Sequence, residues 1–382
     1  MKSDFIVIGA GIAGLSAAYE LSALGQVTVL EQERVPGYHT TGRSAAISSL
    51  NFISPTVQAL TVASRDFLTN HPECFGAHPL TSLRQSLWVT QPHQIEAHNA
   101  MRSEALDRKY RVRELTADEV VSLCPVLRRD KVSMGLLEED TLDLDVHGMM
   151  QGYTKGLRAR GGAIESNTAA ETIEWDGAWW RVRSGERFFS APVLVNAAGA
   201  WGDVVAEKAG VAPLKIRPLR RTVFTFEAPA GVAPNSWPFV YDTAEQFYFK
   251  LENGIILASA FDEIESPPCD AWADDYDIAA AIERILAVTT LEVRSLKNRW
   301  AGLRTFAPDR ELVVGPSPGH PGFYWLTGHG GIGLMTAPAV AQALAGLVRT
   351  GTLPAHLASL GLVAADLSAG RFDGSPVVEA AA

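Results

Sequence analysis

The alternation of apolar and polar residues near the N-terminus predicts a strand, a helix and a second strand. Residues 4–8 (DFIVI) form an apolar run of strand length, and a stretch rich in Ala and Leu then extends to Leu24 before Gly25 interrupts it. A second apolar run, residues 27–30 (VTVL), follows directly. Two apolar strands joined by one helix over so short a distance are typical of a parallel βαβ unit.

The turn between the first strand and the helix carries the glycine spacing of a dinucleotide-binding motif. Gly9, Gly11 and Gly14 give the G-x-G-x-x-G pattern, which permits a tight turn, close approach of the backbone to a pyrophosphate and close helix packing. Glu31 ends the second strand, where its carboxylate can accept both ribose hydroxyls and would repel a 2′-phosphate. The motif therefore disfavours NADP, but it does not separate FAD from NAD.

Further along the chain the pattern becomes mixed. Residues 86–90 (SLWVT) predict a strand, and residues 92–109 and 116–123 predict helices. The acidic run 138–145 (EEDTLDLD) predicts a solvated turn in which Asp145 caps the next helix. Residues 193–203 (VLVNAAGAWGD) predict a fully buried strand of a parallel sheet, running into a turn of small residues.

An antiparallel section follows, and the chain then returns to a glycine-rich apolar pattern. A long alternating strand covers residues 215–228, and Asn253–Gly254 gives a hairpin turn signal. A helix near residues 274–287 and a strand through RWAGLRTF complete this section. We therefore expect an α/β protein of mixed α+β character, with a Rossmann-like nucleotide-binding domain that carries an inserted antiparallel-sheet domain. The first domain is predicted in three pieces, 1–79, 142–212 and 306–382, and the substrate-binding domain in two, 80–141 and 213–305.

Composition and charge narrow the class of protein. The chain has 382 residues, 47% of them hydrophobic, which is enough for two domains with their own cores. A net charge of −10 argues against a nucleic-acid or anionic-membrane binder, although a few local arginines could still hold a small anion. Cys74, Cys124 and Cys269 are far apart, so neither disulfides nor zinc are expected, and no histidine spacing suggests a metal site. The N-terminus does not resemble a signal peptide, and we expect a cytoplasmic protein.

The stretch from Phe323 to Val348 has the length of a membrane span and contains no Asp, Glu, Lys or Arg. Four glycines between residues 328 and 333, Pro338 and Gln342 make it a poor lipid-facing helix. We therefore predict a buried strand, loop and helix rather than a membrane span.

Four motifs in the same order resemble the D-amino-acid oxidase-like family of FAD-dependent oxidoreductases. The resemblance rests on DFIVIGAGIAGLSAAYELS with VLEQE, on GYHTTGRSAA, on VLVNAAGAWGD and on TGHGGIGLMTAPAVAQALA, and it covers nearly the whole chain. Within the family, PVLRRDKV and WAGLRTF are most similar to the D-arginine dehydrogenase branch. The NAD alternative would explain only the first motif.

The resemblance implies tightly but noncovalently bound FAD, since no cysteine lies in the matched flavin motifs. Residues 40–47 would wrap the cofactor and continue into a lid, with Arg43 offering charge to it, although an ordinary surface loop could have the same composition. The helix after Gly333 would aim its positive end at the flavin ring. His329 could act as a base or could simply pack at the helix start. The cofactor-binding residues implied are Gly9, Gly11, Ala13, Gly14, Glu31, Gln32, Thr40, Thr41, Gly42, Arg43, Ser44, Ala45, Ala46, Ala170, Ala198, Gly199, Trp201, Gly330, Gly331, Ile332, Gly333 and Leu334.

For the substrate, the resemblance implies a carboxylate clamp made of Arg221, Arg304 and Tyr248. Bidentate arginine suits this role because its planar fork fixes direction as well as charge. Each of these side chains could instead point to solvent from a strand. Alternation along the strand sends Arg220 to the opposite face from Arg221. No side chain has to form a covalent bond, because hydride passes from the substrate Cα to flavin N5 and the imino acid then hydrolyses to a 2-oxo acid and ammonia.

The chain departs from the D-arginine dehydrogenase pattern at the substrate pocket. Ile47 and Phe52 stand where those enzymes have histidine and tyrosine, and Ser86 replaces an acidic residue that meets the cationic side chain. Phe239 and Tyr241 would form walls of this pocket, and Gly331 would line it beside the flavin. Loss of a charged partner costs about 1.5–3 kcal/mol, so D-arginine should be a poor substrate.

Three functions therefore remain. The first is oxidative deamination of uncharged, apolar or aromatic D-amino acids by a dehydrogenase or oxidase whose acceptor is oxygen, a quinone or a carrier protein. The second is oxidation of a secondary amine, an N-alkyl amino acid or a 2-hydroxy acid on the same fold. The third is a redox-inactive protein that binds FAD as structure.

Overall fold

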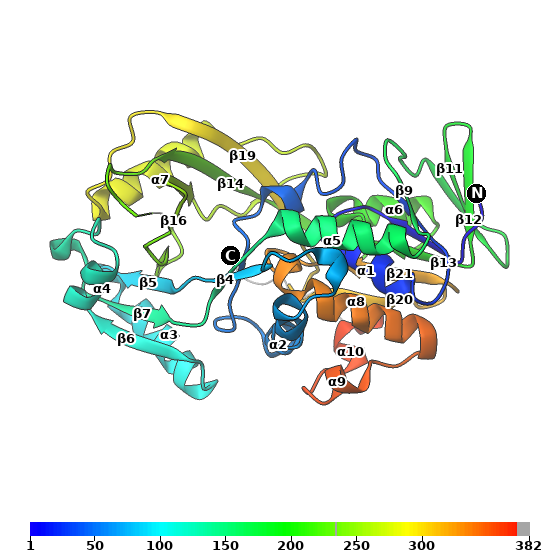
Figure 1. The fold of residues 1–382 in the computed structure, drawn as a ribbon, viewed down its shortest axis with the longest axis horizontal. Helices are drawn as coiled ribbons and strands as arrows, with labels where there is room; N and C mark the ends of the chain where they lie inside the picture. The colour runs from blue at the N-terminus through cyan, green and yellow to red at the C-terminus, as the bar shows by residue number, and fades with distance from the viewer. Residues whose placement is uncertain (234, 373–382) are drawn as a thin grey trace.

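The computed structural model describes residues 1–233 and 235–372, and these residues form two sheet-based halves that share one cleft. In Figure 1 the N-terminal strands and the long C-terminal helix lie in the right half, and most of the inserted antiparallel strands lie in the left half. Strands β14 and β19 run from the left half toward the centre, where the blue N-terminal segment crosses beneath them.

The sheet in the right half has six strands in the order β20-β21-β13-β1-β2-β9. All neighbours are parallel except β20 and β21. The βαβ unit predicted at the N-terminus is β1, α1 and β2, and the predicted strand of residues 193–196 pairs beside β1. The bounds are β1 Phe5–Ile8, β2 Val27–Leu30, β9 Ala163–Glu165, β13 Val193–Asn196, β20 Val313–Pro316 and β21 Phe323–Thr327.

Helices cover one face of this sheet and a small sheet covers the other. The helical face buries a continuous apolar cluster that includes Leu15, Val29, Tyr153 and Leu344. On the other face a three-stranded sheet and a short helix enclose a second cluster around Trp180 and Trp325. The elements are α1 Ile12–Leu21, α2 Pro55–Thr69, α5 Val146–Ala159, α8 Gly333–Thr350, α9 Ala355–Ala358 and α10 Ala364–Leu367, then β10 Thr172–Trp175, β11 Trp180–Ser184, β12 Arg187–Ala191 and α6 Gly202–Lys208.

The sheet in the left half has nine strands and is mostly antiparallel. One of its faces packs on α4 and α7 around Phe224, Phe249 and Ile285. Its other face carries a separate cluster that includes Val223 and Tyr248, and this face borders the cleft. The bounds are β5 Ser86–Thr90, β6 Val112–Thr116, β7 Met134–Glu138, β14 Arg217–Glu227, β15 Phe239–Asp242, β16 Tyr248–Glu252, β17 Ile255–Ser259, β18 Ile264–Glu265 and β19 Leu296–Phe306, with α3 Ile95–Asp107, α4 Ala117–Leu123 and α7 Asp275–Val288.

Strand alternation is confirmed at the two consecutive arginines of β14. The Arg220 guanidinium donates to Asp277 of α7 at 2.7 Å, on the face away from the cleft. Arg221 lines the cleft. The hairpin predicted at Asn253–Gly254 is also confirmed, because β16 and β17 pair across it.

The acidic run 138–145 corrects one expectation. Asp145 does cap α5, since its side chain accepts a hydrogen bond from the backbone of Gly148 at 2.9 Å. Glu138, however, ends β7 and is only 1% exposed, so the predicted solvated turn is wrong at this residue. A fourth sheet consists of the short strands β3 Ile47–Ser48, β4 Thr81–Leu83 and β8 Leu142–Leu144; it includes part of this acidic run and has no counterpart in the prediction.

The apolar stretch 323–348 divides into β21, a glycine-rich loop and most of α8. Across the described ranges, none of the helices combines the length and the apolar character needed to cross a bilayer. The domain boundaries stay a prediction, and residues 373–382 of the last predicted piece lie outside the described residues.

Candidate active site

One long cleft runs between the N-terminal end of α1 and the open face of the nine-stranded sheet. It is bounded by β1, the segment 37–45, the loop after β13, the strands β14 and β19, and the loop before α8. Most of the residues predicted from the resemblance line it: Gly9, Gly11, Ala13, Glu31, Gln32, Thr40, Thr41, Arg43, Ser44, Ala45, Ala170, Ala198, Gly199, Trp201, Gly330, Gly331, Gly333 and Leu334, together with Arg221, Tyr248 and Arg304.

At one end of the cleft the surface is made largely of backbone. Gly9 has a φ of +101°, and a Cβ there would lie 2.5 Å from the Ala197 carbonyl oxygen. A Cβ on Gly14 would lie 1.9 Å from the Gly9 carbonyl oxygen, so Gly14 makes the close helix packing although it does not line the cleft itself. Helix α1 starts after Gly11, which offers no side-chain cap; the Ile12 N–H bonds to the Thr41 hydroxyl, and among the described residues the next N–H groups of the first turn remain available for an anion.

Glu31 closes this end. One carboxylate oxygen accepts from the Ala10 backbone N–H at 2.7 Å and the other from the Glu33 N–H at 2.9 Å. The side chain is 7% exposed and lines the cleft, and each oxygen keeps a lone pair beyond these bonds. The carboxylate is therefore held in place and can accept from two further hydroxyl groups.

The segment 37–46 crosses the middle of the cleft as a short 3₁₀ turn. The Thr41 hydroxyl accepts from the Ile12 N–H at 3.0 Å, and the Thr40 hydroxyl donates to the Leu303 carbonyl at 2.7 Å. A Cβ on Gly42 would lie 2.7 Å from the Gly37 carbonyl oxygen, so Gly42 permits the turn without lining the cleft. These bonds join the segment both to α1 and to β19.

Arg43 differs from its predicted role. Its guanidinium bonds the Asp270 carboxylate at 2.5 Å and the carbonyls of Ala271, Ala301 and Tyr38 at 3.1, 2.8 and 3.2 Å. A cation with a carboxylate partner and three carbonyls has little charge left for a cofactor. Arg43 therefore ties the 37–46 segment to the loop before α7, and no sequence pattern connects these two parts of the chain.

The loop before α8 is the second backbone surface of the cleft. Gly330 has a φ of +47° and lies against Phe306, while a Cβ on Gly331 would lie 2.9 Å from the Arg304 Cζ. Helix α8 begins after Ile332 with no side-chain cap, so its first N–H groups are free for a ligand or water. Ile332 itself does not line the cleft.

His329 lies in this loop as a neutral base. Burial lowers the pKa of the imidazole to about 4. Among the described residues neither His329 Nε2 nor the hydroxyl of Thr327, which also lines the cleft, has a hydrogen-bond partner. Two buried polar atoms without partners at the cleft wall indicate that a bound group with its own polar atoms completes the site.

Arg221 and Arg304 lie side by side at the other end of the cleft, on the same face of the paired strands β14 and β19. Burial and the nearby charge of Arg221 lower the pKa of Arg304 to about 10. In the part of the chain that the structure describes, no hydrogen bond reaches the Arg304 guanidinium, and Nη1 of the buried Arg221 is also without a partner. Glu263 meets Arg221 Nη2 at 3.3 Å from the outer side. Two cations with unused donors in one buried space favour an anion between them.

Tyr248 stands beside this pair from β16. Its side chain is 3% exposed and lines the cleft. The Tyr241 ring lies 5.8 Å from the Tyr248 ring, and the two hydroxyl-bearing rings share the sheet face with Arg221. The predicted clamp residues, which come from β14, β16 and β19, are therefore brought together at one place.

Of the predicted pocket residues, Gly331 lines the cleft, whereas the other five lie beside it and not on its surface. Ile47, Phe239 and Tyr241 pack with Tyr248 in one apolar cluster on the open face of the nine-stranded sheet. Phe52 packs edge-on to Trp88 at 5.4 Å, and the fully buried Ser86 is paired with both Phe239 and Glu138. Ala46, with a φ of +39°, likewise does not line the cleft, because the chain turns away after Ala45.

Sequence reasoning missed two charged side chains near this end. Lys250 follows Tyr248 on the same face of β16, is 3% exposed, and donates to the Ala45 carbonyl at 3.0 Å. Strand alternation from Tyr248 could have revealed it. Glu138 accepts three hydrogen bonds in the interior, and its position at the end of an apolar strand was the only available signal.

The profile of the DAO family, described as FAD dependent oxidoreductase, matches residues 4–347. The chain is 26% identical over 407 residues to FAD-dependent oxidoreductase domain-containing protein 1 of Bos taurus, covering 92% of this chain and 82% of that protein. It is 25% identical over 372 residues to glycine oxidase of Pseudomonas putida, covering 93% and 96%. The fold of L-proline dehydrogenase from P. horikoshii superposes with a TM-score of 0.83 at 19% identity, covering 97% and 98% of the two chains.

The cleft therefore belongs to a flavoprotein of mixed α/β fold. This chain is a member of the DAO family of FAD-dependent oxidoreductases. The residues present fit FAD for two reasons. The glycines before α1 and α8 let a cofactor approach the backbone closely, and Thr327 and His329 at the cleft surface carry polar atoms without partners among the described residues. Across the described ranges no group of His, Cys, Asp and Glu side chains is arranged to hold a metal ion.

Proposed function

We propose that this protein oxidises the carbon–nitrogen bond of an amino acid whose carboxylate is held by Arg221 and Arg304, with uncharged D-amino acids as its preferred substrates. The observation that carries the proposal is the adjacent pair of guanidinium groups on β14 and β19, with unused donors in the described part of the cleft. A planar carboxylate can accept from both forks at once. The similarity to a glycine oxidase and to the fold of an L-proline dehydrogenase supports a substrate with a carboxylate next to an amine-bearing carbon.

The side chains orient the substrate more than they react with it. Arg221, Arg304 and the Tyr248 hydroxyl fix the carboxylate, which leaves only rotation about one bond to place the Cα hydrogen. FAD, when bound, supplies the ring that accepts this hydrogen as hydride. The substrate amine enters unprotonated and loses a proton on oxidation, and water later hydrolyses the imino acid to a 2-oxo acid and ammonia.

The preference for uncharged side chains rests on the surroundings of the clamp. Phe239 and Tyr241 provide ring surface, and Ser86 supplies no charge. Glu138 is a nearby acid, but its two oxygens already accept from Trp88, Ser49 and Asn51. A cationic side chain would therefore find no free carboxylate there, and D-arginine should react slowly.

A second candidate is the oxidation of a secondary amine or an N-alkyl amino acid. Ile47 supports it, because this apolar side chain packs against the cluster around Tyr248 where the D-arginine dehydrogenase pattern has a histidine. The fold similarity to L-proline dehydrogenase, whose name specifies a secondary amine, supports it as well.

The test is anaerobic bleaching of the bound flavin by a panel of D-Phe, D-Met, D-Leu, D-Arg, glycine, sarcosine and L-proline. We expect the uncharged D-amino acids to reduce the flavin fastest and D-arginine to be slow. Reduction by sarcosine or L-proline alone would select the second candidate, whereas no reduction by any member would reject both. Fastest reduction by D-arginine would reject the proposed side-chain preference. Admission of air afterwards shows whether oxygen accepts the electrons.

A further inference from the structure

A buried carboxylate joins two parts of the molecule next to the substrate end of the cleft. Glu138 ends β7 and is 1% exposed. One oxygen accepts from the Trp88 indole N–H at 2.8 Å, and the other accepts from the Ser49 hydroxyl at 2.5 Å and the Asn51 amide at 2.8 Å. Trp88 belongs to the nine-stranded sheet, whereas Ser49 and Asn51 follow the segment that crosses the cleft. Glu138 therefore fastens that segment to the sheet.

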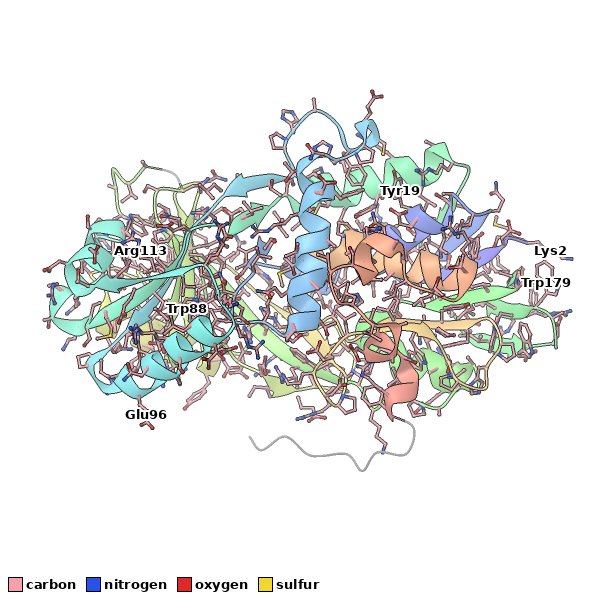
Figure 2. All side chains as sticks on the ribbon, turned by 90° about the horizontal axis from the view of Figure 1, so that it is seen from below. Lys2, Tyr19, Trp88, Glu96, Arg113 and Trp179 are labelled. Atoms are coloured by element: carbon pink, nitrogen blue, oxygen red, sulfur yellow. The ribbon has the colours of Figure 1, made fainter. Side chains whose placement is uncertain are left out.

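Trp88, which is held by Glu138, contacts the aromatic side chains on the face of the nine-stranded sheet that borders the cleft. Its ring stacks on Tyr241 at 4.6 Å and 18°, and Phe239 stacks on Tyr241 at 4.5 Å and 12°. Two nearly parallel rings this close to a third must cover its opposite faces, because on one face they would collide. Trp88 is labelled in Figure 2, inside the cyan sheet of the left half.

The stack leaves the Tyr241 ring only one free direction. A side chain on a sheet face stands roughly perpendicular to the strands, so a ring covered on both faces directs its hydroxyl away from the sheet. Tyr248, the paired residue of β16, stands beside it on the same face with the two rings 5.8 Å apart, so the Tyr241 hydroxyl lies next to the clamp. The charges of Arg304 and Arg221 also act on the Tyr241 pKa, although burial and Tyr248 raise it well above the ordinary tyrosine value. The hydroxyl stays protonated and can donate.

Glu138 itself is not placed to touch a substrate. Its oxygens carry three donors, and burial raises its pKa while these donors oppose that shift. Ser86, its partner across β5 and β7, lies one strand nearer to Phe239. The Glu138 carboxylate helps to raise the Tyr241 pKa through its charge, and it influences the position of the Tyr241 ring through Trp88 and the segment that holds Ser49.

We propose that Glu138 is a positioning residue that, through Trp88, holds the Tyr241 hydroxyl at the side-chain end of the substrate site. The inference rests on the proposed function, because it assumes that Arg221 and Arg304 bind the substrate carboxylate. It adds a determinant of specificity: Tyr241 stands directly behind the clamp next to Tyr248, so a substrate that extends beyond its carboxylate depends on the position of this ring, whereas a short one does not.

The test uses the holoenzyme and two carboxylate probes of different length, acetate and benzoate. Their dissociation constants are measured from the change in visible absorbance of the flavin, in wild type and in Glu138→Gln, Trp88→Phe and Tyr241→Phe. Glu139→Gln is the matched control, because Glu139 is the neighbouring residue and its side chain is 59% exposed. We expect Glu138→Gln to weaken benzoate about tenfold and acetate less than about twofold, with Glu139→Gln like wild type.

Double variants distinguish a positioning role of Glu138 from a general loss of structure at the site. If Glu138 acts through Trp88, the Glu138→Gln/Trp88→Phe double variant weakens benzoate no more than the larger single effect, and Glu138→Gln has no further effect in a Tyr241→Phe background. Additive effects, equal weakening of acetate and benzoate, or an unchanged Glu138→Gln variant would each overturn the proposal. Should Glu138→Gln not fold, Trp88→Phe with Tyr241→Phe gives the same comparison.

Near-ultraviolet circular dichroism separates this proposal from the proposed function. If neither probe perturbs the wild-type flavin, the clamp and the proposed function fail. The aromatic bands then decide the positioning role: loss of the Trp and Tyr signal in Glu138→Gln but not in Glu139→Gln supports it, and unchanged bands overturn it.

Discussion

The two ends of the cleft are built on different principles. At the α1 end the surface is backbone, and Gly9 and Gly14 are needed because a single carbon atom would collide with a carbonyl oxygen. At the β14 end the surface is made of long side chains, Arg221, Arg304 and Tyr248, which reach one place from three strands. The first end should therefore be sensitive to added volume and the second to lost charge.

The largest effect is expected from Gly14→Val, which tests the sensitivity to volume. The new side chain would place its Cβ 1.9 Å from the Gly9 carbonyl oxygen. The turn between β1 and α1 must then open, which changes the backbone surface at this end of the cleft. We expect the protein to lose its flavin on purification, with a ratio of visible to ultraviolet absorbance at least about tenfold lower than wild type. Ala100→Val, at an exposed position of α3, should keep its flavin. A yellow Gly14→Val protein would contradict the backbone argument.

Arg304→Met tests the sensitivity to charge at the opposite end. It keeps much of the side-chain volume and removes a donor fork to the substrate carboxylate, which should lower kcat/KM about 10²–10³-fold. The flavin should stay bound, because Arg304 belongs to the substrate end. Arg299→Met on the same strand β19 is the control, since its side chain is 53% exposed and pairs only with Asp275 among the described residues. Loss of flavin in Arg304→Met, or equal rates for the two variants, would break the comparison.

The loop before α8 is a second backbone surface of the cleft, and the pH dependence of the free energy of unfolding tests how its buried histidine behaves. His329 has a pKa of about 4 in the folded protein against 6.5 for an unperturbed histidine, so between these values the unfolded chain binds a proton that the folded chain rejects. The contribution of His329 to stability is present above pH 6.5 and is lost as the pH falls toward 4, by up to about 3 kcal/mol. Urea unfolding of the protein at pH 7.5 and pH 5 should show this loss, and His329→Gln should reduce it. His78→Gln, at an exposed position, should leave the pH dependence unchanged.

The smallest effect is expected from Thr41→Val, which keeps the shape of the backbone end and removes one acceptor. Its hydroxyl accepts from the Ile12 N–H at 3.0 Å, and valine leaves that N–H without a partner. We expect the dissociation constant of FAD, measured by flavin fluorescence, to rise about three- to tenfold. Thr69→Val, exposed at the end of α2, should not change it. A loss as large as that of Gly14→Val would show that this end depends on side chains after all.

The parts of the structure that depend on local pattern could be predicted from the sequence. The βαβ unit, the cap at Asp145 and the opposite directions of Arg220 and Arg221 each follow from neighbouring residues and the period of one element. The fold family followed from several such motifs in order.

The parts that depend on distant partners could not be predicted. Arg43 meets Asp270, 227 residues away, so its charge is compensated by a residue that no spacing rule connects to it. The acidic run predicts that Glu138 is solvated, yet its donors Trp88, Ser49 and Asn51 come from other elements and bury it. A buried carboxylate is defined by its donors, and these become visible only when the chain is folded.

The unused donors of Arg221 and Arg304 have a practical consequence for anyone who assays this protein. Two desolvated cations will recruit whatever small anion the medium offers, so formate, acetate or sulfate in the buffer should compete with the true ligand. Apparent Michaelis constants should then rise with the concentration of such ions and fall in zwitterionic buffers that are low in salt. A weak substrate could be overlooked for no reason other than the composition of the solution in which it was tried.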